Sequence, residues 1–247
     1  MAHRDEILAY ADELLDVASY PDYGPMGLQV IGAEEVSKIV CGVSASRELF
    51  ERAAAAGAQL VLVHHGILLY KGPHVIDARQ KGRLRALFDA NLTLAAYHVA
   101  LDAHPEIGNN ACLARELGIE RERSFATIGL GGRPREPLTI DGFVERVLER
   151  VASEPLVFAH GPERIERVAI SSGKAGNDLL TAANEGYDLF LTGEPEEGSL
   201  HTALELGIHF VAAGHYATER LGVQALAARL AGRFDLEWEF VDLPNPV

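Results

Sequence analysis

The sequence predicts an α/β protein made of two similar lobes, each a sheet flanked by helices. Three observations support this prediction. Short, near-continuously apolar runs alternate with helical stretches, which is typical of sheets covered on both faces. An internal pseudo-repeat relates the first half of the chain to the second. The 247 residues, 48% of them hydrophobic, supply enough apolar material for one large or two modest domains.

In the first half, a helix is followed by an alternation of strands and helices. Apolar residues recur at helical spacing over residues 4–15, which predicts an amphipathic helix. Three apolar runs predict buried strands, namely KIVCGVS (38–44), QLVLVHH (59–65) and TLAAYHV (93–99). Three further segments have a helical pattern, at 46–56, 78–91 and 107–118.

The second half resumes the alternation after a break in the middle of the chain. The glycine-rich IGLGG at 128–132, followed by Pro134 and Pro137, is the strongest break signal. We therefore predict a first lobe over residues 1–128 and a second over 129–247. Four apolar runs predict strands in the second lobe: PLVFAHG, RVAISSG, DLFLTG and HFVAAG. A long helix over about 216–234 and a last strand, EWEFVD, follow, and docking of this strand on the first lobe stays open.

The internal repeat aligns strands of the two lobes. Gly57 is set on Gly186, an offset of 129 residues, and the same offset sets KIVCGVS on RVAISSG. Short strand–helix units also resemble one another by chance, which is the alternative explanation. The shared offset, and the recurrence of a histidine followed four residues later by an acid at an offset of 117, favour a duplicated α/β unit.

Composition and charge narrow the class of protein. The chain has 22 Lys and Arg residues against 36 Asp and Glu. Its net charge of −14 argues against non-specific binding to the phosphates of nucleic acids. Two cysteines cannot form a disulfide framework and fit a reducing compartment. No signal peptide is visible, and the longest apolar stretch is too short to span a bilayer. We expect a cytoplasmic protein with neither a membrane nor a nucleic-acid partner.

Histidines collect where predicted strands end. His64 and His65 close one strand, and Gly66 permits the chain to leave the sheet there. Adjacent residues of a regular strand face opposite ways, so both imidazoles converge only if the strand ends at this point. An isolated pair of this kind is more often two histidines at a strand end whose hydrogen bonds are made within the protein and which bind no ligand.

Two further histidines end strands, and each is followed four residues later by an acid. His98 precedes Asp102, and His215 precedes Glu219 on the same face of the predicted long helix. Each pair alone fits a surface ion pair or a helix cap, but six such groups together favour a metal site. Imidazole and carboxylate ligands suit Zn, Mn, Fe, Co or Ni. The surplus of ligands points to two divalent metal ions.

Five sequence blocks occur in order over nearly the whole chain: DYGPMGLQVIG, LVHHGILLYKG, YHVALDAHPEIGNNACLARELGI, LTGE and AAGHYATERLGVQAL. In these blocks the chain resembles the NGG-interacting-factor-three-like family, whose bacterial members are named GTP cyclohydrolase I type 2 homologues. The resemblance implies two interlinked α/β lobes with a dinuclear divalent-metal site in the cleft between them. It also implies a ring-shaped homohexamer.

The resemblance further implies roles for individual residues. It transfers the metal ligands of the family to His64, His65, Asp102, His215 and Glu219. His98 matches a histidine that family members place beside the metals, and we assign it to acid/base work or to support of the ligands. Glu194, which the repeat sets on His65, is a second candidate for proton transfer, and a role near a helix N-terminus is its alternative.

The chain departs from the family pattern in two places. ILLY at 67–70 stands where members bring an aromatic residue, often Trp, before Lys-Gly, so the pocket wall differs. DYGPM at 22–26 stands where members more often show Asp-Asn, which leaves the role of this loop open.

Two functions fit these features. The first is a metal-dependent hydrolase acting on a nucleotide or phosphorylated small molecule, with His98 or Glu194 moving the proton. The family name implies GTP cyclohydrolase-type activity, although the sequence reveals no purine pocket. The alternative is a non-catalytic metal-binding or regulatory interaction protein that forms a ring-shaped oligomer. Five protein ligands shared by two ions leave coordination positions open, which favours the hydrolase.

Overall fold

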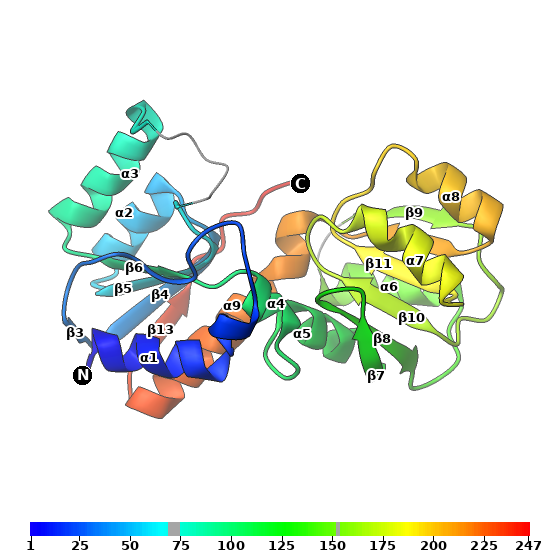
Figure 1. Ribbon diagram of the computed structural model, residues 1–247, viewed down its shortest axis with the longest axis horizontal. Coiled ribbons are helices and arrows are strands. Elements are labelled where there is room, and N and C mark those ends of the chain that lie inside the picture. Colours follow the sequence, from blue (N-terminus) through cyan, green and yellow to red (C-terminus); the bar gives the residue numbers. More distant parts are fainter. Residues whose placement is uncertain (69–74, 152–153) are drawn as a thin grey trace. The chain divides into compact units, whose positions relative to one another are not determined.

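The computed structural model describes residues 1–68, 75–151 and 154–247 (Figure 1). The chain forms two compact α/β units, as the fold class predicted. Unit 1 comprises Met1–Leu101 with Gly222–Leu243, and unit 2 comprises Asp102–Leu221 with Pro244–Val247. This division differs from the predicted boundary at 128/129. The glycine-rich segment lies inside β8 (Gly129–Pro134), which pairs with β7 (Ile119–Phe125), so both strands belong to unit 2.

Unit 1 contains a five-stranded sheet and a small ribbon. Its strands are β1 (Ala2–His3), β2 (Gly27–Val30), β3 (Glu35–Val36), β4 (Lys38–Ser44), β5 (Leu60–His65), β6 (Thr93–Ala96) and β13 (Glu237–Phe240). Its helices are α1 (Arg4–Leu14), α2 (Arg47–Ala55) and α3 (Ala78–Asp89), together with the second half of α9 (His215–Phe234). The sheet order is β13-β4-β5-β6-β2, and only β2 is antiparallel to its neighbour. The C-terminal strand β13 thus extends the sheet of unit 1 beside β4.

Alternation along the strands of unit 1 supplies two buried faces. Val61 and Val63 of β5 pack with Leu49 and Phe50 of α2 on one face, in a cluster that also includes Leu87 of α3. Figure 1 shows α2 and α3 on one side of this sheet and α1 on the other. Both faces of a mostly parallel sheet are therefore covered, which explains why its strands are apolar at consecutive positions.

Unit 2 contains a six-stranded sheet of order β7-β8-β10-β11-β12-β9. Its remaining strands are β9 (Leu156–Ala159), β10 (Val168–Ser171), β11 (Leu189–Thr192) and β12 (His209–Ala212). Its helices are α5 (Asn109–Glu116), α6 (Ile140–Arg150), α7 (Leu179–Asn184), α8 (Ser199–Leu206) and the first part of α9. The central strands β10, β11 and β12 are parallel, and antiparallel strands flank them.

The two faces of this second sheet also have separate cores. Leu189 and Leu191 of β11 pack in a cluster with Phe143 of α6, whereas Phe190 packs in a cluster with Ala182 of α7. A short helix, α4 (Val99–Ala103), contains the first point at which the chain passes from one unit to the other, and α9 contains the second. Among the helices in the described ranges, none has both the length and the apolar character needed to cross a membrane.

The predicted repeat is present in the strand register. Ile39 of β4 pairs with Leu60 of β5, and Val168 of β10 pairs with Leu189 of β11, so both strand pairs keep the offset of 129 residues. Gly57 and Gly186 both have positive φ, at 72° and 75°. The repeated histidine–acid pair lies differently with respect to its helix in the two units. His98 is the residue before α4 begins, whereas His215 is the first residue of α9.

Candidate metal centre

Three histidines gather at one edge of the sheet of unit 1. β5 ends at His64 and His65, and His98 follows the parallel strand β6, so all three lie at the carboxyl edge. The ring centroids are 4.6 Å apart for His64 and His65 and 4.9 Å apart for His64 and His98. One ring nitrogen from each residue lies within 4.8 Å of the other two. This group could hold a metal ion.

His64 is fully buried and its ring is oriented by the backbone. Its Nδ1 lies 2.8 Å from the carbonyl oxygen of Tyr97 and donates to it, because a carbonyl oxygen only accepts. The Tyr97 hydroxyl in turn donates to Oδ1 of Asp12 at 2.7 Å, and burial holds the pKa of that hydroxyl well above its ordinary value. With its proton on Nδ1, His64 carries its lone pair on Nε2, the form that binds a metal.

His98 is bonded to a carboxylate from the loop before β2. Both carboxylate oxygens of Asp22 lie 2.9 Å from Nδ1 of His98. Burial works against the charge on Asp22, but hydrogen bonds from His98 and from the backbone N–H groups of Tyr23 and Val99 outweigh it and lower the pKa of the carboxyl. Asp22 therefore accepts hydrogen bonds as an ionised carboxylate.

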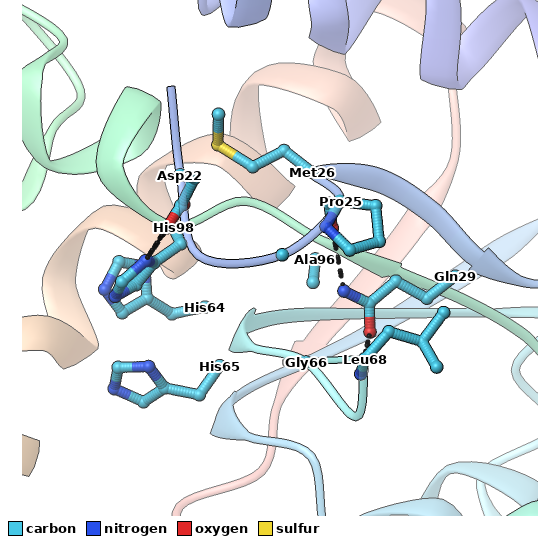
Figure 2. Close-up of a pocket in the computed structure, with 11 residues that line it drawn as sticks. Asp22, Pro25, Met26, Gln29, His64, His65, Gly66, Leu68, Ala96 and His98 are labelled. Carbon is cyan, nitrogen blue, oxygen red and sulfur yellow. Dashed lines mark hydrogen bonds and ion pairs between the residues drawn. The ribbon is translucent and has the colours of Figure 1, made fainter. Parts of the chain in front are cut away.

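A small pocket adjoins the histidines of unit 1 (Figure 2). Its apolar wall comes from Pro25, Met26, Leu68 and Ala96. The predicted departure at 67–70 falls partly on this wall, at Leu68, whereas Leu69 and Tyr70 lie outside the described residues.

Gln29 of β2 fixes the loop that follows His65. Its Oε1 accepts from the backbone N–H of Ile67 at 2.8 Å, and its Nε2 donates to the carbonyl oxygen of Pro25 at 2.9 Å. A Cβ atom on Gly66 would overlap this side-chain amide. Glycine at position 66 therefore leaves the space in which the Gln29 amide bonds to both Pro25 and Ile67.

Substituting Gly66→Ala is expected to destabilise the protein by about 1–3 kcal/mol, because Gln29 must leave its hydrogen bonds to make room. Gln29→Ala should lose the same hydrogen bonds. The double variant should therefore be no less stable than Gly66→Ala alone. Urea unfolding of the four proteins measures the coupling, and strictly additive losses would contradict the overlap.

In unit 2, His215 lies between two carboxylates. Its Nε2 is 3.0 Å from Oε2 of Glu219, one turn along α9, and its Nδ1 is 2.5 Å from Oε1 of Glu194, which follows β11. Burial disfavours a charged imidazole here, but hydrogen bonds and charge from Glu219 and Glu194 outweigh it and raise the pKa of His215 to about 9. A metal ion that binds His215 has to displace this proton.

Two glycines let backbone approach Glu219 and His215 closely. Gly173 follows β10 with φ of +65°, and a Cβ there would overlap Oε1 of Glu219. A Cβ on Gly193 would come within 2.7 Å of the Cα of His215. Thr218 joins this arrangement, since its hydroxyl accepts from the backbone N–H of Gly173 at 3.0 Å.

Asp102 is the second buried carboxylate of unit 2, with 3% of its surface exposed. Its Oδ1 accepts from Nδ2 of Asn109 at 2.8 Å and from the hydroxyl of Ser172 at 3.1 Å. Asn110 holds the same region by donating to the carbonyl oxygen of Asp102. One carboxylate oxygen of Asp102 lies within 4.8 Å of one from Glu219, so unit 2 gathers two buried carboxylates beside a histidine.

The family model for Duf34/NIF3 (NGG1p interacting factor 3) matches residues 2–246. This chain belongs to the NIF3 family. A GTP cyclohydrolase 1 type 2 homolog from Pseudomonas aeruginosa is 44% identical over 246 residues, covering 96% of this chain and 95% of that protein. The homolog from Escherichia coli K12 is 40% identical over 242 residues, covering 98% of both. The resemblance stated from the five sequence blocks is thereby confirmed.

Solved structures of the NIF3 fold agree with this assignment. A protein described as ybgI, of unknown function, superimposes with a TM-score of 0.97 at 40% identity, and both chains are covered completely. TTHA1606 from Thermus thermophilus gives a TM-score of 0.92 at 38% identity, again over both whole chains. HcgD from Methanocaldococcus jannaschii shares the fold, with a TM-score of 0.85 at 23% identity over 98% of each chain.

The structure of this NIF3-family chain distributes the predicted site residues over its two units. His64, His65 and His98 come together in unit 1, whereas Asp102, Glu194, His215 and Glu219 belong to unit 2. The other histidines have separate surroundings. His201 is exposed on α8, His209 is buried and bonded to the carbonyl oxygen of Pro162, and His74 lies outside the described residues.

Sequence reasoning missed several residues that support the NIF3 site. Asp22 and Gln29 both lie in the first of the five family blocks, where only a departure from the family pattern drew attention. Ser172 and Gly173 lie in a Ser-Ser-Gly turn that resembles a weak phosphate-binding signal, yet they contact Asp102 and approach Glu219. Their roles depend on contacts between distant parts of the chain.

Proposed function

We propose that this NIF3-family chain binds two divalent metal ions and hydrolyses a nucleotide or another phosphorylated small molecule. The observation that carries the proposal is the meeting of His64 and His65 with His98 beside them, since one ring nitrogen from each lies within 4.8 Å of the other two. The buried member of this group, His64, already has the tautomer that a metal requires. Neutral imidazoles and buried carboxylates are the donors expected of Zn, Fe, Mn, Co or Ni.

The proposed metal ligands are His64, His65, Asp102, His215 and Glu219. Asp102 lies on α4, four residues after His98 along the chain. The supporting contacts also fit, since His64, His215 and Asp102 each have a hydrogen-bond partner that orients the ligand atom. When bound, two divalent ions would supply Lewis acidity and the activation of water.

His98 and Glu194 are the proposed proton carriers. Nδ1 of His98 is committed to Asp22, so its Nε2 is the nitrogen placed to exchange a proton with substrate. Glu194 is bonded to Nδ1 of His215, and the same contact lets it orient that ligand. General acid and base groups of this kind contribute roughly 10²–10⁴ in rate.

The proposal is tested by metal analysis and a substrate screen. The purified wild-type protein is expected to contain about two divalent ions per chain, as in two-metal sites, and the His64→Ala/His215→Ala variant is expected to contain almost none. His201→Ala is the matched control, since this histidine is exposed on α8. Full metal occupancy in the double variant would contradict the ligand assignment.

Turnover separates the hydrolase from the alternative function. The screen covers nucleotides, including GTP, and phosphoesters, with wild type and His98→Ala compared side by side. A metal-loaded protein that turns over none of them would favour a non-catalytic metal-binding or regulatory role.

From the family resemblance we also propose a homohexamer acting in the cytoplasm, and light scattering of the purified protein would test the hexamer.

A further inference from the structure

Asp22 is a nearly buried carboxylate that the proposed chemistry does not use. Its side chain is only 4% exposed, although it lies in the loop before β2. A charge so far removed from water needs compensating partners. Those partners therefore indicate what this residue does.

The partners of Asp22 constrain one imidazole. Both oxygens lie 2.9 Å from Nδ1 of His98, and Oδ2 also accepts from the backbone N–H of Val99, the first residue of α4. Because an ionised carboxylate only accepts hydrogen bonds, Nδ1 of His98 must carry the proton. The lone pair of the neutral ring is then on Nε2.

His98 stands next to the two histidines of β5. Its ring centroid is 4.9 Å from that of His64 and 5.3 Å from that of His65. Figure 2 shows the three imidazoles gathered together, with the bond from Asp22 reaching His98. A rotation of the His98 ring, or a move of its proton to Nε2, would remove the lone pair from this group.

We propose that Asp22 is a positioning residue that fixes the orientation and tautomer of His98. The DYG loop, whose role the sequence left open, thus presents Nε2 of His98 to whatever His64 and His65 bind. The catalytic consequence of this positioning rests on the proposed hydrolase function, but the positioning itself does not. The competing explanation is that Asp22 only caps α4 through Val99.

The tautomer of His98 in metal-free protein distinguishes the two explanations. ¹⁵N-labelled wild type should show His98 protonated on Nδ1 at a pH where the imidazoles are neutral, with the signals assigned by comparison with His98→Gln. In Asp22→Asn the amide can donate to Nδ1, and in Asp22→Ala the partner is absent. Both variants should therefore show the Nε2-protonated form of His98, alone or in a mixture.

Asp77→Asn is the matched control. Asp77 caps α3 by accepting from the backbone N–H of Gln80 at 2.8 Å, so this variant alters a helix cap in the same unit away from the imidazoles. Its His98 signals should equal those of wild type. Nδ1 protonation of His98 that persists in both Asp22 variants would overturn the proposal and leave the capping role.

A turnover measurement gives a second readout wherever the screen finds a substrate. Asp22→Ala should then lower kcat about 10-fold or more, with KM little changed, whereas Asp77→Asn should not. A kcat equal to that of wild type would overturn the catalytic consequence. The tautomer of His98 is measured without metal or substrate, so the two proposals can fail separately. If the Asp22 variants change this tautomer but the wild-type protein turns over no substrate, the positioning role of Asp22 is supported and the hydrolase function is refuted.

Discussion

Replacing Gly173 with alanine is expected to lower the free energy of unfolding by about 2–4 kcal/mol and to displace Glu219. The left-handed backbone at this position, with φ of +65°, costs an alanine about 1–2 kcal/mol. The new methyl group also overlaps Oε1 of Glu219, whose side chain is nearly buried, and overpacking of this kind costs about 1–3 kcal/mol. The strain falls directly on a proposed metal ligand.

Gly207→Ala is the control for Gly173→Ala. Gly207 lies in the same unit with φ of +64°, and the nearest atom that a Cβ would meet is 3.8 Å away, the carbonyl oxygen of His160. Its substitution carries the backbone cost without the overlap. Urea unfolding measures both variants, and metal analysis should show a loss only in Gly173→Ala. Equal destabilisation of the two would contradict the contact with Glu219.

Removal of divalent ions by a chelator is expected to lower the melting temperature by about 10 °C. Asp102 and Glu219 are buried with carboxylate oxygens within 4.8 Å of each other, so a cation that binds them relieves repulsion between like charges. A ligand present at about 1,000 times its Kd stabilises the folded state by about 4 kcal/mol, and each kcal/mol shifts the melting temperature of a protein of this size by about 2–4 °C.

Calorimetry with and without the chelator, followed by re-addition of Zn²⁺, Mn²⁺ or Co²⁺, checks this expectation. The metal that restores the melting temperature at the lowest concentration is the best candidate for the native ion. The His64→Ala/His215→Ala variant should show no shift. A wild-type melting temperature that is indifferent to both treatments would exclude a tightly bound metal.

The strands were predictable because tertiary structure reinforces their local pattern. KIVCGVS at 38–44 coincides with β4, and the run at 59–65 contains β5, since continuous apolar sequence is what a strand covered on both faces requires. The third run, at 93–99, extends beyond β6, because the chain turns after Ala96 to begin α4 at Val99. Periodicity contains no signal for such a turn.

The unit boundary could not be predicted because glycine-rich sequence occurs both in linkers and in closely packed strands. Gly131 and Gly132 resemble a linker, yet both lie within β8. A Cβ at Gly131 would overlap the Tyr187 hydroxyl, and one at Gly132 would overlap the backbone of Glu120. These glycines are required by close packing inside a sheet. The residues that they pack against are distant in sequence, so the local pattern gives no sign of this requirement.

The candidate site was predictable to the extent that its residues occupy strand ends. His64, His65 and His98 follow apolar runs, so their convergence in unit 1 follows from parallel pairing of β5 and β6. The residues that orient them do not follow in this way. Asp22 reaches His98 across 76 residues of sequence and Ser172 reaches Asp102 across 70, and no spacing rule connects such positions.

The discontinuity of unit 1 imposes an order on synthesis at the ribosome. All six strands of the sheet of unit 2 have been translated once Ala212 is made, whereas the sheet of unit 1 needs β13, at Glu237–Phe240, to cover the edge of β4. The later half of the chain can therefore complete its sheet first. The nascent N-terminal region keeps the edge of β4 unpaired until β13 has been made, which leaves that edge open to wrong strand pairing during translation.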